Sequence, residues 1–160
     1  MNSCYVLTLI TFGVLSLAFA QSFWYFPIFK ANHLTFMILT SIVYFFTETL
    51  VIFFYVGTGV SIKEYVLEHH LSDDYRRRSF QIKRKVYPPL LMNMLYMSVL
   101  FVLVGAVDTG KFPVWAYRLL FLFCIVDYLR IKLIQNDCFR DNTQIVLDMA
   151  GVKAPVGAGV

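Results

Sequence analysis

The chain has 160 residues, of which 59% are hydrophobic and 15% are charged, with 14 Lys and Arg against 10 Asp and Glu. A soluble domain of this length has too little interior for so many apolar side chains, so the composition predicts a polytopic membrane protein. The three cysteines (Cys4, Cys124 and Cys138) form no Cys-x-x-Cys pair, which argues against a disulfide framework and against thiol–disulfide chemistry.

Four runs of the sequence approach or exceed the ~20 residues that a helix needs to cross a hydrocarbon core about 30 Å thick. They cover approximately residues 4–29, 34–56, 88–107 and 114–134. We therefore predict an all-α integral membrane protein, with residues 1–160 folded as one four-transmembrane-helix bundle.

The first run contains the small-x-small pattern Ala18-Phe19-Ala20, which is typical of a signal-peptide cleavage site. The five residues that open the chain carry no Lys or Arg, however, and the sequence stays apolar and aromatic well beyond Ala20. A cleaved signal has a basic start, a shorter apolar core and a polar mature sequence. We expect a retained helix; cleavage is the alternative and would leave three spans.

The connector over residues 61–87 is predicted to be helical. Gly57 and Gly59 are expected to end the second span, because glycine readily adopts the positive φ of a helix terminus. Side chains at helical spacing then predict a short amphipathic helix on the membrane surface: Ile62, Tyr65, Val66 and His69. Ser72 is expected to cap a second short helix, which meets Pro88 and Pro89 at the first turn of the third span.

Basic residues predict the topology. Eleven of the 14 Lys and Arg lie in the long connector, or at and beyond the end of the fourth run. The positive-inside rule then places the connector and both termini in the cytoplasm, and we expect the inner membrane of a bacterium. The tail over residues 151–160 is expected to be flexible coil. Six basic residues are expected to bind anionic lipid headgroups rather than nucleic acid: Arg76, Arg77, Arg78, Lys83, Arg84 and Lys85.

Polar residues within the runs are the best functional pointers, because burying them in a membrane is costly. At ~1.5 Å per residue, Glu48 and Asp127 lie about 20 Å from the outer ends of their runs, which places both in the inner third of the bilayer. Other runs bring polar groups close to that level. The predicted polar residues are Glu48, Asn93, Asp127, Arg130, Tyr44, Tyr96, Thr8 and Thr11.

Two interpretations of these polar residues remain open. In the first, the residues form interhelical hydrogen bonds that hold the bundle together. In the second, they form a functional site, which is either a proton or ion site or a pocket for a headgroup such as a quinone. We favour the structural interpretation and expect an ion pair between Glu48 and Arg130. The alternative partner of Arg130 is Asp127, three residues earlier on the same helix.

Metal and cofactor signals are weak. His69 and His70 are adjacent, so their side chains point about 100° apart on a helix and chelate poorly, and they are weak candidates only. No histidine lies inside a predicted span, where a transmembrane haem would need its ligands. We predict no metal and no cofactor; a bound lipid or quinone is left open.

The sequence shows no catalytic nucleophile motif and no nucleotide-binding loop, whereas its 16 Phe, ten Tyr and six Met give broad, adaptable apolar faces. We therefore expect a non-catalytic accessory or scaffold subunit of a larger membrane complex, packed against partner subunits, lipids or pigments. A small proton-coupled carrier or a quinone-associated redox protein is the alternative, and a homo-oligomer is also open.

Overall fold

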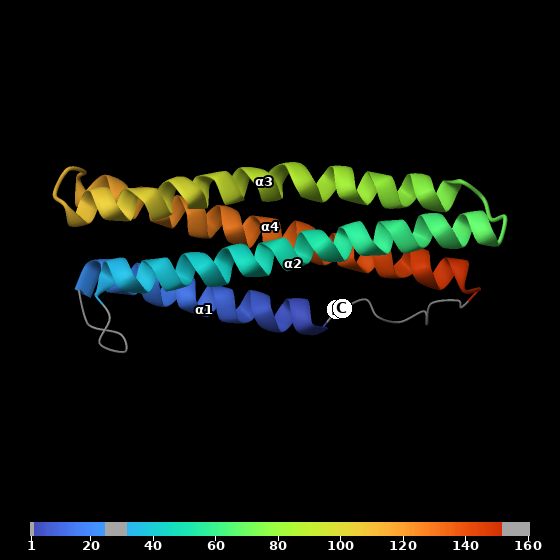
Figure 1. Cartoon of the computed structure of the whole chain (residues 1–160), viewed down its shortest axis with the longest axis horizontal. Coiled ribbons are helices and arrows are strands. Elements are labelled where there is room, and N and C mark those ends of the chain that lie inside the picture. Colours follow the sequence, from blue (N-terminus) through green and yellow to red (C-terminus); the bar gives the residue numbers. More distant parts are fainter. Residues whose placement is uncertain (1, 25–31, 152–160) are drawn as a thin grey trace.

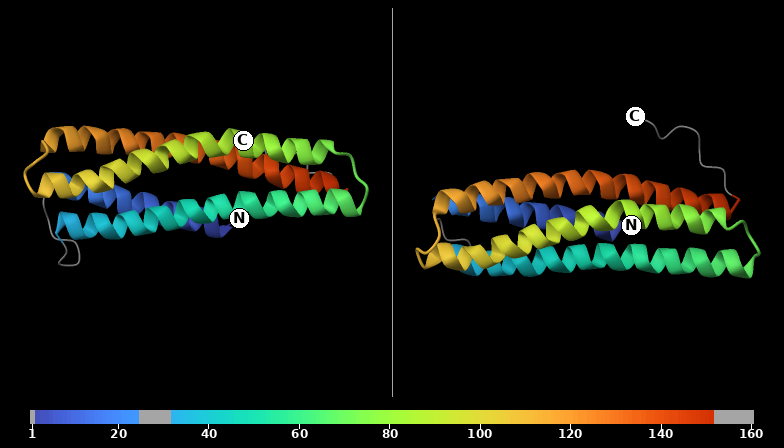
Figure 2. Two further views of the ribbon diagram at one scale, coloured as in Figure 1. Left: turned by 45° about the horizontal axis from the view of Figure 1, so that its top comes forward. Right: turned by 90° about the horizontal axis from the view of Figure 1, so that it is seen from above.

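The computed structural model describes residues 2–24 and 32–151. They form four helices: α1 (Asn2–Trp24), α2 (His33–Glu68), α3 (Asp74–Asp108) and α4 (Val114–Met149). The helices run antiparallel in one elongated bundle, in which each packs on its sequence neighbour and α1 also contacts α4 (Figures 1 and 2). The predicted all-α bundle is confirmed for this part of the chain.

Three of these helices, α1, α2 and α3, are long and apolar enough to cross a membrane. The fourth, α4, is not among them, because its apolar stretch contains Arg118, Asp127, Arg130 and Lys132. The predicted residues 25–29 of the first span and 152–160 of the flexible tail lie outside the described residues.

The predicted break in the second helix is wrong. Gly57 and Gly59 lie within α2, which continues without interruption to Glu68. The residues assigned to a separate surface helix are its last turns. Ile62 and Val66 are 2% and 4% exposed and belong to the core, and their burial compensates for the ~1 kcal/mol that each glycine costs in a helix.

The predicted boundary at the two prolines is also wrong. Pro88 and Pro89 lie inside α3 rather than in its first turn, and the helix already begins at Asp74. Val86 and Leu90, on either side of the prolines, are each 1% exposed. Burial of this face holds the helix together although a proline lacks the N–H that a helix interior normally uses. The predicted cap Ser72 is one residue out, because the N-cap of α3 is Asp73; the Ser72 hydroxyl still accepts a hydrogen bond from the Asp74 N–H at 3.3 Å.

The helices differ in length. Since α2 and α4 have 36 residues each, they measure about 54 Å, well beyond a ~30 Å hydrocarbon core, whereas the 23 residues of α1 measure about 35 Å. The amino-terminal end of α1 therefore lies near the middle of the bundle (Figure 1). Beyond that level, α2, α3 and α4 continue as a three-helix segment that ends at the α2–α3 turn.

The interior contains two apolar clusters. One lies in the four-helix part and includes Leu15, Met37, Met97 and Phe121. The other lies largely between α2, α3 and α4, and includes Val51, Ile62, Val86 and Phe139. The clusters explain why the helices carry a regular buried stripe, and polar side chains occupy the level between them.

Candidate functional site

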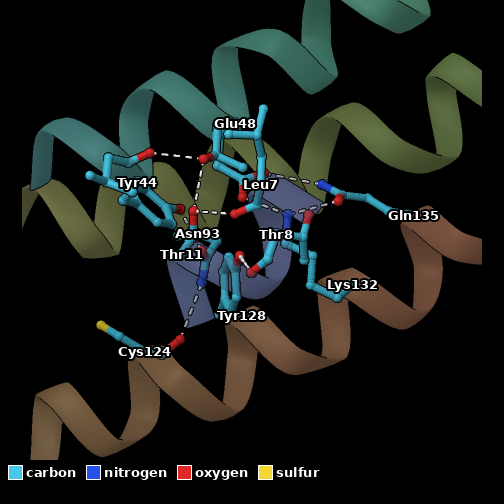
Figure 3. Close-up of polar contacts among 12 residues, drawn as sticks. Leu7, Thr8, Thr11, Tyr44, Glu48, Asn93, Cys124, Tyr128, Lys132 and Gln135 are labelled. Atoms are coloured by element: carbon cyan, nitrogen blue, oxygen red, sulfur yellow. Dashed lines mark hydrogen bonds and ion pairs between the residues drawn. The ribbon is translucent and has the colours of Figure 1, made fainter. Parts of the chain in front are cut away.

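A layer of polar side chains crosses the bundle between the two apolar clusters, and all four helices contribute to it (Figure 3). We call this set the polar layer. Its members are Thr11 of α1; Tyr44, Thr47 and Glu48 of α2; Asn93 of α3; and Asp127, Tyr128, Lys132 and Gln135 of α4.

The buried carboxylate of Glu48 is paired with a lysine. Lys132 Nζ lies 2.6 Å from Glu48 Oε1, and the two side chains are 13% and 1% exposed. Gln135 Nε2 donates to the second carboxylate oxygen, Oε2, at 3.2 Å, and Gln135 Oε1 accepts from Lys132 Nζ at 2.9 Å. The ammonium also lies 4.7 Å from the centre of the Tyr128 ring. Both carboxylate oxygens therefore have partners, and the negative charge has a counter-charge.

A second chain of hydrogen bonds joins α2, α3 and α4. The Tyr44 hydroxyl donates to Asn93 Oδ1 at 2.6 Å, and Asn93 Nδ2 donates to Asp127 Oδ2 at 2.9 Å. Asn93 is 1% exposed, so its amide has no access to bulk water. Because both ends of this amide are used within the protein, Asn93 links its two neighbouring helices.

The first helix joins the polar layer through hydroxyl groups. Thr11 Oγ1 lies 2.7 Å from Thr47 Oγ1 of α2, and each hydroxyl also lies within 2.9 Å of a carbonyl in its own helix. A hydroxyl has one proton, so one threonine donates across to the other while the second donates to its own backbone. The Tyr128 hydroxyl reaches the Thr8 carbonyl at 3.5 Å, a weaker contact.

The predicted polar residues divide into three groups. Thr11, Tyr44, Glu48, Asn93 and Asp127 lie together in the polar layer, and Thr8 contributes its backbone carbonyl. Tyr96 lies away from the layer, half-buried with its ring against Phe123. Arg130 is exposed on the outside of α4.

The predicted Glu48–Arg130 ion pair is therefore wrong, because Lys132 takes that place. The reason is helix geometry. Tyr128, on α4, faces the interior of the bundle. Lys132, four residues later, lies about 40° away around the helix axis, whereas Arg130, two residues later, points about 200° away. The alternative pair of Arg130 with Asp127 is also absent from the ion pairs of the described residues, and Asp127 Oδ2 accepts from Asn93 instead.

Sequence reasoning missed Lys132 because basic residues at the inner end of the fourth run were interpreted as topology signals, and it missed Gln135 because that residue lies one position beyond the predicted run. A signal was present. Buried positions of α4 recur as Tyr117, Phe121 and Tyr128, and Gln135 continues that stripe while Lys132 lies beside it.

The six basic residues predicted to bind lipid lie on three faces of α3. Arg76, Arg77 and Lys83 line a groove between α2 and α3. Arg78 and Lys85 line a second groove, toward α4, and Arg84 is exposed outside both.

The Arg78 guanidinium lies 3.0 Å from a carboxylate oxygen of Asp148 at the end of α4. Gln144 Nε2 donates to the other oxygen at 2.7 Å. The Gln144 hydrogen bond and the Arg78 charge hold the pKa of Asp148 below its usual range.

The two adjacent histidines lie in the turn that follows α2. The His69 ring stacks on Tyr65, with ring centres 4.1 Å apart, and His70 lies in the turn with φ of 50°. Within residues 2–24 and 32–151, no group of three or more His, Cys, Asp or Glu side chains is placed to hold a metal ion.

Comparisons with protein families, curated proteins and solved structures found no significant match. The polar layer can do two things chemically. It can fix the register of four helices through mutual hydrogen bonds, and it can keep one acid–base pair, Glu48 and Lys132, away from water.

Proposed function

We propose that this protein is a non-catalytic accessory or scaffold subunit of a larger membrane complex. The observation that carries the proposal is the saturation of the polar layer: both oxygens of Glu48 and both ends of the Asn93 amide are bonded to other side chains of the chain. Groups that bond one another across four helices fix a rigid bundle, and they leave little capacity to bind a substrate.

The outer surface supports the same proposal. Large apolar side chains are exposed along every helix, and they can contact partner subunits, lipids, pigments or a second copy of the chain. Six examples are 60–76% exposed: Leu9, Ile42, Phe53, Val102, Leu119 and Leu133.

The proposal includes α4 as a fourth span. Three of its charges are bonded within the bundle: Lys132 pairs with Glu48, Asp127 accepts a hydrogen bond from Asn93, and the Arg118 Nε donates to the Ser22 carbonyl at 3.1 Å. Its outward face carries large apolar side chains, among them Trp115, Leu122 and Val126, with Arg130 exposed near the inner end. Such a helix is stable in a membrane when its neighbours satisfy its polar groups. We propose a bacterial inner membrane, with both termini and the α2–α3 turn in the cytoplasm.

Purification in a mild detergent, followed by chemical cross-linking and mass spectrometry, tests the subunit proposal. We expect the full chain to co-migrate with larger membrane subunits and to cross-link to them. Recovery of a lone monomer, under conditions that keep other membrane complexes intact, would contradict it.

The Glu48–Lys132 pair favours one second candidate, a proton-coupled carrier or a quinone-associated redox protein, because ionisable pairs within membrane spans often mark proton paths. An absorbance spectrum and a quinone extraction of the pure protein test the redox version. Uptake driven by a pH gradient in liposomes tests the carrier, and Glu48→Gln should abolish that uptake.

A further inference from the structure

A basic groove lies between α2 and α3, next to the turn that joins them. Its volume is about 500 Å³, and its lining includes Lys63 of α2 with Arg76, Arg77 and Lys83 of α3. Asp73 is the acidic member, so the groove carries four positive charges and one negative charge, a net charge of +3. Arg76 is bonded to Asp73 at 3.5 Å, and among the described residues the other three cations have no ion-pair partner.

The groove is built around a glycine. A methyl group at Gly59 would overlap the Lys83 ammonium, and the Ser79 hydroxyl oxygen lies 3.5 Å from the same position. The absence of a side chain at Gly59 is therefore what lets α3 place Lys83 against the surface of α2. A helix interior does not otherwise favour glycine, which costs ~1 kcal/mol there relative to alanine.

The depth of the groove suits a lipid headgroup. Gly59 lies three residues past the apolar run that ends at Val56, and Lys83 lies five residues before Pro88. At ~1.5 Å per residue, Gly59 and Lys83 lie roughly 5–8 Å beyond the hydrocarbon boundary, within the thickness of the headgroup layer. By the same measure Lys63 lies about 10 Å beyond the boundary, and Arg77, close to the turn, about 16 Å beyond it. Phe80, 64% exposed, also lines the groove and provides an apolar surface beside the cations.

We propose that the membrane-facing end of this groove binds the phosphate-bearing headgroup of an anionic lipid, with Lys63 and Lys83 as the charged ligands and Gly59 as the residue that keeps the groove open. A terminal phosphate is the preferred chemistry, because it offers several strong acceptor oxygens and carries more charge than a phosphodiester. The inference is independent of the proposed subunit role, since it rests on a different part of the molecule.

Native mass spectrometry of the purified full chain tests the proposal, with phosphatidic acid, phosphatidylglycerol and soluble glycerol 3-phosphate as the probes. We expect phosphatidic acid to bind about fivefold more tightly than phosphatidylglycerol, because it adds a charge-assisted contact. Equal affinity for the two lipids would overturn the proposal. Equal affinity for glycerol 3-phosphate and phosphatidic acid would identify a soluble phosphate as the ligand and overturn the lipid assignment.

Two lysines of one helix provide a matched pair of variants. Lys83→Gln removes a charge from the groove and should weaken binding of phosphatidic acid about tenfold. Lys85→Gln removes the same charge only two residues away, but Lys85 lines the other groove, toward α4, so its effect should be less than twofold. Equal losses in the two variants would show that only the general basic charge of the surface matters, and would overturn the proposal.

Gly59→Ala separates binding from folding. The added methyl group displaces the Lys83 ammonium, which is the end of a flexible side chain, so we expect binding of phosphatidic acid to fall several-fold. The same change should raise the melting temperature, since alanine favours a helix more than glycine does. A variant that is more stable and binds as tightly as the wild type would overturn the role of Gly59 in the groove.

Discussion

The pair formed by Glu48 and Lys132 shows how a helical bundle can hold charged side chains in its interior. A buried ion that loses its partner is costly, typically 3–5 kcal/mol, whereas replacement of both partners by apolar residues is often neutral. Here the carboxylate is 1% exposed and the ammonium 13%, so the two charges depend on each other. The same pair also joins α2 to α4 across the bundle.

Glu48→Gln should lower the stability of the bundle by about 3–5 kcal/mol, because the Lys132 ammonium would remain buried without a counter-charge. The double variant Glu48→Met with Lys132→Met should return most of that loss. Thermal unfolding of the protein in detergent measures both changes. Arg130→Met is the control, and should change stability little because Arg130 is exposed. An unchanged melting temperature for Glu48→Gln, beside a destabilised Arg130→Met, would contradict the assignment.

The Asp148 carboxylate should give a pH-dependent contribution to stability. Its pKa is lowered in the folded protein by the Gln144 hydrogen bond and by Arg78, so its contribution is fully present above the unfolded pKa of about 3.9 and disappears as the pH falls through the lower folded value. Asp148→Asn should therefore melt below the wild type at pH 7, with a difference that shrinks on acidification below about pH 4. Melting curves over a pH series check this. A difference that stays constant at acidic pH would contradict it.

At the level of the helix, α2 continues through Gly57, and this leads to a prediction about that residue. A methyl group there meets no atom within 4 Å, and Gly57 does not have the positive φ found at Gly110 and Gly151. Gly57→Ala should therefore stabilise the protein by roughly 0.5–1 kcal/mol. If the helix ended at this glycine with a positive φ, as the sequence predicted, alanine would be destabilising instead.

Gly110 provides the contrasting control for that experiment. It lies in the turn between α3 and α4 with φ of 71°, a conformation that costs an L-residue about 1–2 kcal/mol. Gly110→Ala should lower the melting temperature in the same assay. Opposite signs for the two glycines would show that one lies within a helix and the other in a turn.

The helices themselves could be predicted from the sequence more readily than their ends. Apolar composition located the four helical regions, because each must cover a core or face lipid. The ends at Gly57 and Pro88 were misplaced because glycine and proline are only local signals. Burial of Ile62 and Val86 outweighs them, and that burial depends on neighbours far away in the sequence.

For the molecule as a whole, the proposed topology places the α2–α3 turn on one side of the membrane and the α3–α4 turn on the other. Reporter fusions after residues 31, 75 and 110 should therefore report outside, inside and outside, because the long connector and the tail carry most of the basic residues. An inside signal at residue 31 would overturn the topology. These three fusion points all precede α4, so a fourth fusion after residue 151 tests whether α4 crosses the membrane, and it should report inside.

Part of the polar layer could also be predicted. Equal depths along the runs brought Glu48, Asn93 and Asp127 to one level, because rise per residue is fixed in a helix. The partner of Glu48 could not be predicted in this way. It depends on the rotation of α4 about its axis, and a shift of two residues exchanges Lys132 for Arg130.

Helices α2, α3 and α4 extend beyond the amino-terminal end of α1, and this extension sets the position of the α2–α3 turn. The part of α2 from Val56 to Glu68 has no break, so in the proposed topology the α2–α3 turn lies about 18 Å beyond the hydrocarbon boundary, with α3 packed between α2 and α4. A molecule bound at the α2–α3 turn, the tip of this three-helix segment, would therefore stay at a constant distance from the bilayer. Seven added residues in each of the three helices would raise the tip by about 10 Å and turn it by only ~20°, which keeps the same faces inward. Three added residues would instead rotate the tip by about 300°, which is 60° less than a full turn. The buried stripes of the three helices above and below the insertion would then no longer be aligned.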